Sequence, residues 1–185
     1  MRTLVVLGAA ALLVLGGLAG WLAGRELEAA ETVTETTTTE TTTTAVIGDL
    51  PAAVEETRAA LLEAAESGDY EELRPLVPAD LAYAFGDSVK GGAIAYWREL
   101  ERTSDARPLE TLAAILRMPY VLSRGLYVWP WAYTIESADD VSPHERELLA
   151  PLGPLTMLFP PGIGYLGWRV GIEPDGSWAF FVAGD

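Results

Sequence analysis

Aromatic side chains occupy every second position of one short stretch. In the segment 126–134 these are Tyr127, Trp129, Trp131 and Tyr133. Successive side chains of a strand point to opposite sides, so an extended segment would place all four rings on one face. Such a face is either core packing, because large rings dominate protein interiors, or the wall of a cavity for an apolar or sugar-like ligand. The second reading makes these four residues candidate ligand-binding residues.

A single arginine gives the fifth candidate. Arg169 lies between Gly167 and Gly171 on the side of a predicted strand opposite Trp168 and Val170. It either faces solvent or points into the mouth of the cavity. There a guanidinium would bind an anion, since it pairs bidentately with carboxylates and phosphates.

Several kinds of catalytic site are excluded by composition. The chain has one histidine and no cysteine, which excludes a three-histidine zinc site and a Cys–His dyad. The one histidine, His144, is expected to be exposed near the start of a helix. No nucleophile elbow, phosphate loop or dinucleotide motif is present. The sequence therefore predicts no catalytic residue, no metal site and no cofactor, and an enzyme is the less favoured hypothesis.

The first half of the domain is predicted to be helical. Asp49 is expected to cap a first helix that ends at Gly68, and the segment 69–72 resembles a capping box for a short helix through Leu76. A short strand is expected at 81–85. A third helix follows Gly91 and Gly92, and a fourth starts at Pro108, with a stripe formed by Leu109, Leu112, Ala113 and Leu116.

The second half is predicted to be mostly strand. Strands are expected at 120–122 and 126–134, with Arg124 in the turn between them. A helix starting with the capping box Ser142–Glu145 is expected to reach Ala150, followed by an apolar Pro/Gly-rich loop over 151–164. A hairpin of 166–172 and 178–183 closes the chain. Helices first and strands afterwards predict an α+β domain.

The order of these elements, together with the segments SGDYEEL and GGAIAYWREL, resembles the NTF2-like superfamily over about residues 50–183. The resemblance implies a cone in which a curved antiparallel sheet wraps helices around a cavity. By analogy it also implies the alternative of an enzyme with an aspartate base, and Asp80 and Asp87, which flank the first predicted strand, are the candidates for that base. Similar single-pass proteins occur in bacterial envelopes, some beside lipid-import systems. The helix pair at 91–117 and the loop at 151–164 depart from the usual order.

The amino-terminal segment predicts a membrane anchor. Residues Thr3–Gly24 contain no charged side chain, and as a helix they would span about 33 Å, enough for a hydrocarbon core of about 30 Å. We interpret 1–25 as a transmembrane signal anchor. The alternative is a secretory signal peptide cleaved after the segment 17–19. Arg2 precedes the segment and Glu26 follows Arg25, which favours a carboxyl-terminal domain outside the cytoplasm.

Residues 26–45 predict a linker between this anchor and the domain of residues 46–185. Ten of the fourteen residues in 31–44 are threonine and three are glutamate, so this tract cannot bury enough apolar surface to order itself. We expect a disordered spacer, with an O-glycosylated stalk as the alternative.

The chain is acidic, with a formal net charge of −15. Repulsion between like charges disfavours nucleic acid or an anionic lipid surface as a partner. Lys90 is the only lysine beside eleven arginines, a composition typical of a GC-rich bacterium. The sequence thus favours a membrane-anchored binding domain of the bacterial envelope for an apolar or anionic ligand or an envelope protein. The alternatives are the NTF2-like enzyme and a purely structural spacer domain.

Overall fold

The structure, a computed structural model, describes residues 49–85 and 89–184. The predicted anchor (1–25), the linker (26–45) and Asp87 lie outside the described residues. No helix within the described part of the chain has the length and apolar character needed to span a bilayer.

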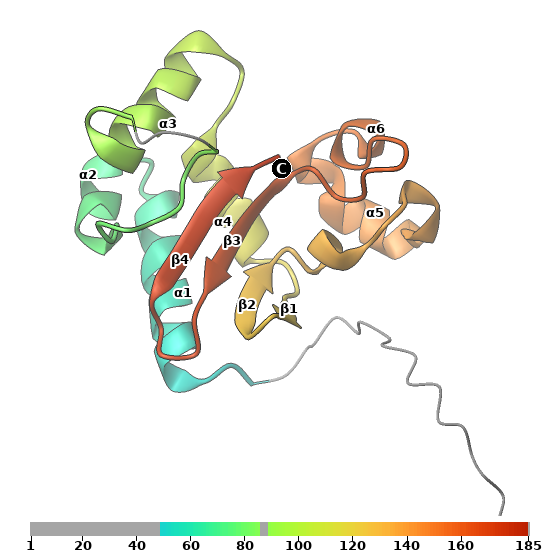
Figure 1. The fold of residues 1–185 in the computed structure, drawn as a ribbon, viewed down its shortest axis with the longest axis horizontal. Helices are drawn as coiled ribbons and strands as arrows, with labels where there is room; N and C mark the ends of the chain where they lie inside the picture. Colours follow the sequence, from blue (N-terminus) through green and yellow to red (C-terminus); the bar gives the residue numbers. More distant parts are fainter. Residues whose placement is uncertain (1–48, 86–88, 185) are drawn as a thin grey trace, which may run out of the picture. The chain divides into compact units, whose positions relative to one another are not determined.

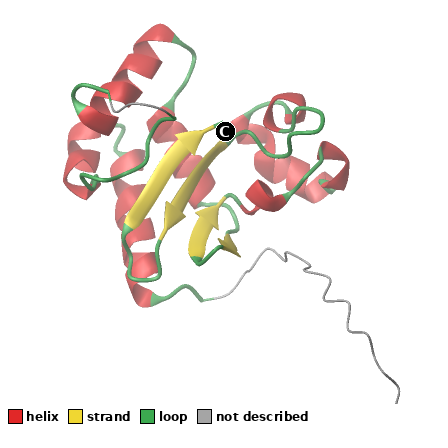
Figure 2. Cartoon of the chain, in the orientation of Figure 1, coloured by secondary structure: helices red, strands yellow, loops and turns green. Residues whose placement is uncertain are grey.

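Helices precede most of the sheet along the chain (Figures 1 and 2). The α-helices are α1 (Ala52–Glu66), α2 (Tyr70–Leu73), α3 (Gly92–Thr103), α4 (Pro108–Leu116), α5 (Pro143–Leu149) and α6 (Leu155–Leu158). The 3-10 helices are η1 (Arg74–Leu76), η2 (Trp131–Thr134), η3 (Ala138–Asp140) and η4 (Ala150–Leu152). The strands are β1 (Val121–Ser123), β2 (Leu126–Trp129), β3 (Trp168–Ile172) and β4 (Trp178–Ala183).

The four strands form one antiparallel sheet in the order β1-β2-β3-β4. Val128 pairs with Gly171, and Val170 pairs with Phe181, so the register joins the aromatic stretch of β2 to the carboxyl-terminal hairpin. In Figure 1, α1 and α4 lie behind the β3–β4 hairpin, and α5 and α6 lie at the right of the view. The α+β class predicted from the sequence is confirmed at this level.

Local signals fix several element ends. Ser142 and Glu145 form the predicted capping box, with both reciprocal hydrogen bonds present. Gly68, at φ +71°, follows the end of α1 as expected. The prediction for Asp49 was wrong, because Pro51 occupies the N-cap position and no side chain caps α1. Asp69 does cap α2, accepting a hydrogen bond from the Glu71 amide.

Two predicted strands are shorter in the structure. The strand expected at 81–85 is reduced to a single bridge, in which Ala82 pairs with Phe180 of β4. The strand expected over 126–134 ends at Trp129, and η2 follows it. Pro130 has no N–H to continue the ladder, and the Trp131 amide donates instead to the Pro119 carbonyl at 2.9 Å. The loop predicted at 151–164 contains η4 and α6.

One side of the sheet packs against α1 and α4, and we call it the α1/α4 face. Its core combines apolar residues of these helices with large rings, and Trp97, Trp129, Trp178 and Phe181 are each no more than 3% exposed. Trp97 of α3 lies 5.3 Å from Phe181 and 6.0 Å from Trp178, measured between ring centroids. Side chains therefore fill the space between the sheet and these helices.

The other side, which we call the opposite face, carries Val128, Arg169, Gly171 and Phe180. Alternation and the register put these residues on one side. A second apolar cluster covers part of this face, with contributions from Trp131, Val141, Leu149, Leu158 and Tyr165. Its covering elements are η2, α5, α6 and the loops between them, all shorter than α1 and α4.

Candidate functional site

The four aromatic residues predicted to share one face are divided between the two sides of the sheet. Tyr127 and Trp129 belong to the core of the α1/α4 face, and Trp131 and Tyr133 belong to the cluster of the opposite face. The prediction of a single aromatic face was wrong. Alternation holds only while the chain is extended, and the extended segment ends at Trp129.

Tyr127 and Trp129 pack with a third ring. Tyr120 lies 5.7 Å from Tyr127 and 5.4 Å from Trp129, measured between centroids. Trp129 is 1% exposed. These contacts and this burial make the pair part of the core, which was the first of the two interpretations of the aromatic stretch.

Trp131 is buried and fixed through its indole. Its Nε1 donates to Oε1 of Glu145 at 3.0 Å, so η2 is tied to the capping box of α5. Hydrogen bonds from Ser142, and a further one from Trp131, hold the pKa of Glu145 below its usual value. Tyr133, two residues further on, is only half-buried.

Arg169 lies between aromatic rings. It is 8% exposed, and its guanidinium carbon is 5.3 Å from the Tyr133 ring centroid and 5.9 Å from that of Phe85. These are cation–π distances. Arg169 therefore does not face solvent, and the structure brings it together with Tyr133, one of the four predicted aromatic residues.

An open depression of about 500 Å³ lies next to this contact. Its lining comes from two segments that are distant in sequence, Tyr133–Glu136 and Gly162–Tyr165. Tyr165 is buried, and its hydroxyl donates to the Trp168 carbonyl at 2.9 Å. Burial raises the pKa of the Tyr165 hydroxyl, and the charge of Arg169 opposes part of that shift. Arg169 is not among the residues that line the depression.

Exposed apolar side chains accompany this region. Ile163, in the lining, is 57% exposed, and Phe85, whose ring contacts the Arg169 guanidinium, is 58% exposed. Met157, in α6 of the same uncharged 151–164 segment, is 73% exposed. Of these three residues, Ile163 adds exposed apolar surface to the depression itself.

The remaining sequence candidates are on the surface. His144 is exposed, as predicted, and Arg124 is exposed at φ +52°, which fits its interpretation as a turn residue. Asp80 is exposed and does not line the depression. Within residues 49–85 and 89–184, no three His, Cys, Asp or Glu side chains come close enough to hold a metal ion.

Of the eight described residues that line the depression, sequence reasoning identified only Tyr133. Gly162, Ile163 and Gly164 belong to the segment 151–164, which was recognised only as an apolar Pro/Gly-rich loop. Its signal was the absence of any charged residue over 151–164 in a chain of net charge −15. Thr134, Ile135 and Glu136 were missed because a strand was expected to continue to residue 134.

Comparison of the chain with protein-family models, curated proteins and solved structures gave no match.

Proposed function

We propose that the protein is a membrane-anchored binding domain on the outer side of a bacterial cell membrane. The proposal combines the uncharged segment Thr3–Gly24, the acidic charge and a surface depression with exposed apolar residues. The NTF2-like resemblance is part of it as a hypothesis, supported by the order of helices before an antiparallel sheet.

We place the ligand site in the depression between Tyr133–Glu136 and Gly162–Tyr165. The observation that carries this choice is the contact of the buried Arg169 with Tyr133, which fixes a half-buried ring at the edge of an open space. The ligand is a neutral apolar group that packs on Tyr133 and Ile163. Among the described residues of the lining, Glu136 is the one that carries a charge, and it disfavours an anion there.

Two half-buried tyrosines allow a matched test of this site. Tyr133 lies at the depression and Tyr127 lies on the α1/α4 face. The neutral dye N-phenyl-1-naphthylamine is titrated into the full chain and into the Tyr133→Ala and Tyr127→Ala variants. We expect Tyr133→Ala to weaken dye binding several-fold and Tyr127→Ala to leave it nearly unchanged. If both variants weaken dye binding equally, the depression is not the binding site.

The anionic-ligand alternative is tested with a charged dye. If 8-anilinonaphthalene-1-sulfonate binds more tightly than the neutral dye, and Arg169→Gln abolishes that difference, Arg169 acts on the ligand directly. Equal or weaker binding of the sulfonate supports the neutral ligand.

The anchor is tested by protease treatment of intact cells. The positively charged amino terminus and the acidic residues after Arg25 lead us to expect digestion of the domain, with the amino-terminal segment left in the membrane. A domain that stays protected until the cells are lysed would contradict the proposed orientation.

A further inference from the structure

A second surface, independent of the Tyr133 depression, runs along α1. Two adjacent depressions of about 420 Å³ and about 370 Å³ share Ala60 and Leu76 in their linings, and together we call them the α1 groove. The groove follows α1 from Glu56 to Ser67, which is about 17 Å at the rise of an α-helix. Its other wall is formed by η1, Pro78 and the β3–β4 turn.

The accessible apolar surface of this α1 groove comes from Ala60, Leu76 and Pro78, which are partly exposed, because Leu61, Ala64 and Trp178 are buried. Small side chains of α1 leave room above the helix, and larger apolar residues of the other wall border it. The apolar lining residues are Ala60, Leu61, Ala64, Leu76, Pro78 and Trp178.

The wall made by the β3–β4 turn is held in place. Thr57 Oγ1 donates to the Gly176 carbonyl at 2.7 Å. A Cβ at Gly176 would lie 2.7 Å from the Ala53 carbonyl oxygen, so the turn approaches α1 closely. The groove is therefore preformed at this end.

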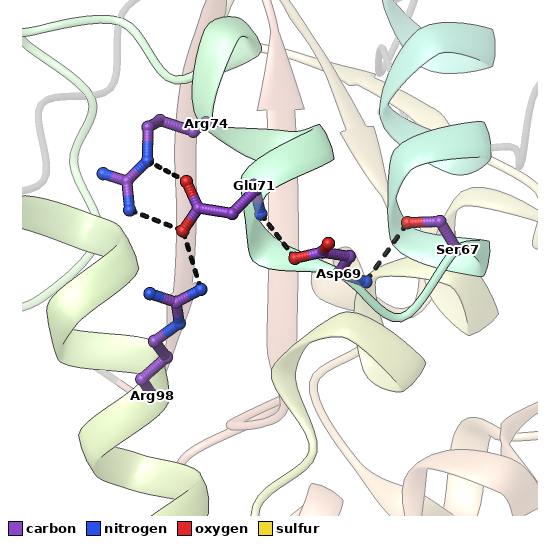
Figure 3. Close-up of polar contacts among 5 residues, drawn as sticks. All are labelled: Ser67, Asp69, Glu71, Arg74 and Arg98. Carbon is purple, nitrogen blue, oxygen red and sulfur yellow. Dashed lines mark hydrogen bonds and ion pairs between the residues drawn. The ribbon is translucent and has the colours of Figure 1, made fainter.

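The side of the groove formed by α2 and η1 is also held in place, by a network of polar contacts (Figure 3). Glu71 accepts from Arg74 Nε at 2.7 Å and from Arg98 Nη2 at 2.8 Å, which connects α2 to α3. Hydrogen bonds from Arg74 and then from Arg98 lower the pKa of Glu71 to about 2. Ser67 Oγ accepts from the Asp69 amide at 3.1 Å, which connects the end of α1 to the cap of α2.

The rim of the α1 groove carries three exposed carboxylates, Glu56, Glu63 and Glu72. In the part of the chain that the structure describes, none of them forms an ion pair. Their sequence neighbours differ in this respect: Glu55 pairs with Arg58, Glu66 with Arg117, and Glu71 with Arg74 and Arg98. No Lys, Arg or His is among the described residues of the lining.

We propose that the α1 groove docks a basic amphipathic segment of a partner protein. The apolar side of the segment lies on Ala60, Leu76 and Pro78, and its Lys or Arg side chains reach the three carboxylates. The length of the groove suits about three helical turns. A second copy of this acidic chain would bring like charges together, which excludes it as the occupant.

The test uses a fluorescein-labelled amphipathic helical peptide of leucine, alanine and lysine, about three turns long, and the same peptide with glutamate in place of lysine. Binding to the full chain in a neutral detergent is followed by fluorescence anisotropy at low ionic strength. We expect the lysine peptide to bind and the glutamate peptide not to bind. A groove variant carries Glu56→Gln, Glu63→Gln and Glu72→Gln. It should bind the lysine peptide about tenfold more weakly, because it loses three exposed ion pairs with the peptide.

The matched control carries the same change in net charge at exposed positions away from the groove, with Asp105→Asn, Asp140→Asn and Glu147→Gln. We expect its affinity for the lysine peptide to change less than twofold. A chain with Glu→Lys at the three groove positions should instead bind the glutamate peptide. Equal weakening in the groove and control variants would show attraction to net charge alone and overturn the proposal, as would equal binding of the two peptides to the unmodified chain.

Discussion

Side chains alternate between the two faces of the sheet along every strand, but different elements cover each face. On the α1/α4 face, two helices of fifteen and nine residues lie over rings that are almost fully buried. On the opposite face, the covering elements have seven residues or fewer and alternate with loops. A long helix presents a continuous apolar stripe to a sheet, whereas short helices and loops leave gaps.

In our proposal, this difference separates core packing on the α1/α4 face from ligand binding at the Tyr133 depression. Rings on the α1/α4 face fill a core and stabilise the domain. The opposite face keeps an open depression, a buried arginine and exposed apolar residues. Changing one residue on each face tests whether stability or ligand binding responds.

The largest effect is expected on the α1/α4 face. Trp129→Ala removes a ring that is 1% exposed and leaves a cavity beside Tyr120. The free energy of unfolding should fall by about 3–5 kcal/mol. Urea denaturation followed by circular dichroism measures it. A loss below about 1 kcal/mol would mean that this face is not the packed core that we describe.

A smaller loss is expected at the buried arginine of the opposite face. Arg169→Gln removes a cation that contacts Tyr133 and Phe85, and we expect a cost of about 2 kcal/mol, the value of a desolvated cation–π contact. The exposed Arg124 is the control, and Arg124→Gln should change stability by less than about 0.5 kcal/mol. Equal effects at the two arginines would contradict the buried position of Arg169.

The smallest effect concerns pH. Because hydrogen bonds lower the folded-state pKa of Glu145 below the usual 4.5, its contribution to stability is present above that value. The contribution is lost as the pH falls through the lower folded-state pKa. Glu145→Gln should therefore make the acid-side decline in melting temperature shallower. Glu147→Gln, at an exposed position of the same helix, should leave the decline unchanged. If the melting temperatures of both variants fall equally with decreasing pH, Glu145 does not connect η2 to α5 as described.

Local signals predicted the elements that depend on neighbouring residues. The capping box at Ser142, the start of α4 at Pro108 and the turn at Gly176 all rest on side chains or φ angles within one turn. The alternation around Arg169 was also correct, since Val170 lies on the other face.

What covers each face could not be predicted in this way. The predicted alternation was extended to Tyr133, although Pro130 has no N–H to continue the strand ladder and β2 ends at Trp129. The Tyr133 depression joins two segments separated by 25 residues of chain. Contacts at that separation depend on the tertiary packing of η2 and α6, for which short-range patterns carry no signal.

The most direct test of the difference between the faces is fluorine NMR of the full chain labelled with 3-fluorotyrosine. Single Tyr→Phe variants assign the resonances of Tyr133 and Tyr165 at the depression and of Tyr120 and Tyr127 at the α1/α4 face. On titration with N-phenyl-1-naphthylamine, we predict that the Tyr133 and Tyr165 resonances shift and that those of Tyr120 and Tyr127 do not. Shifts at Tyr120 and Tyr127, with Tyr133 and Tyr165 unchanged, would contradict the assignment of binding to the opposite face.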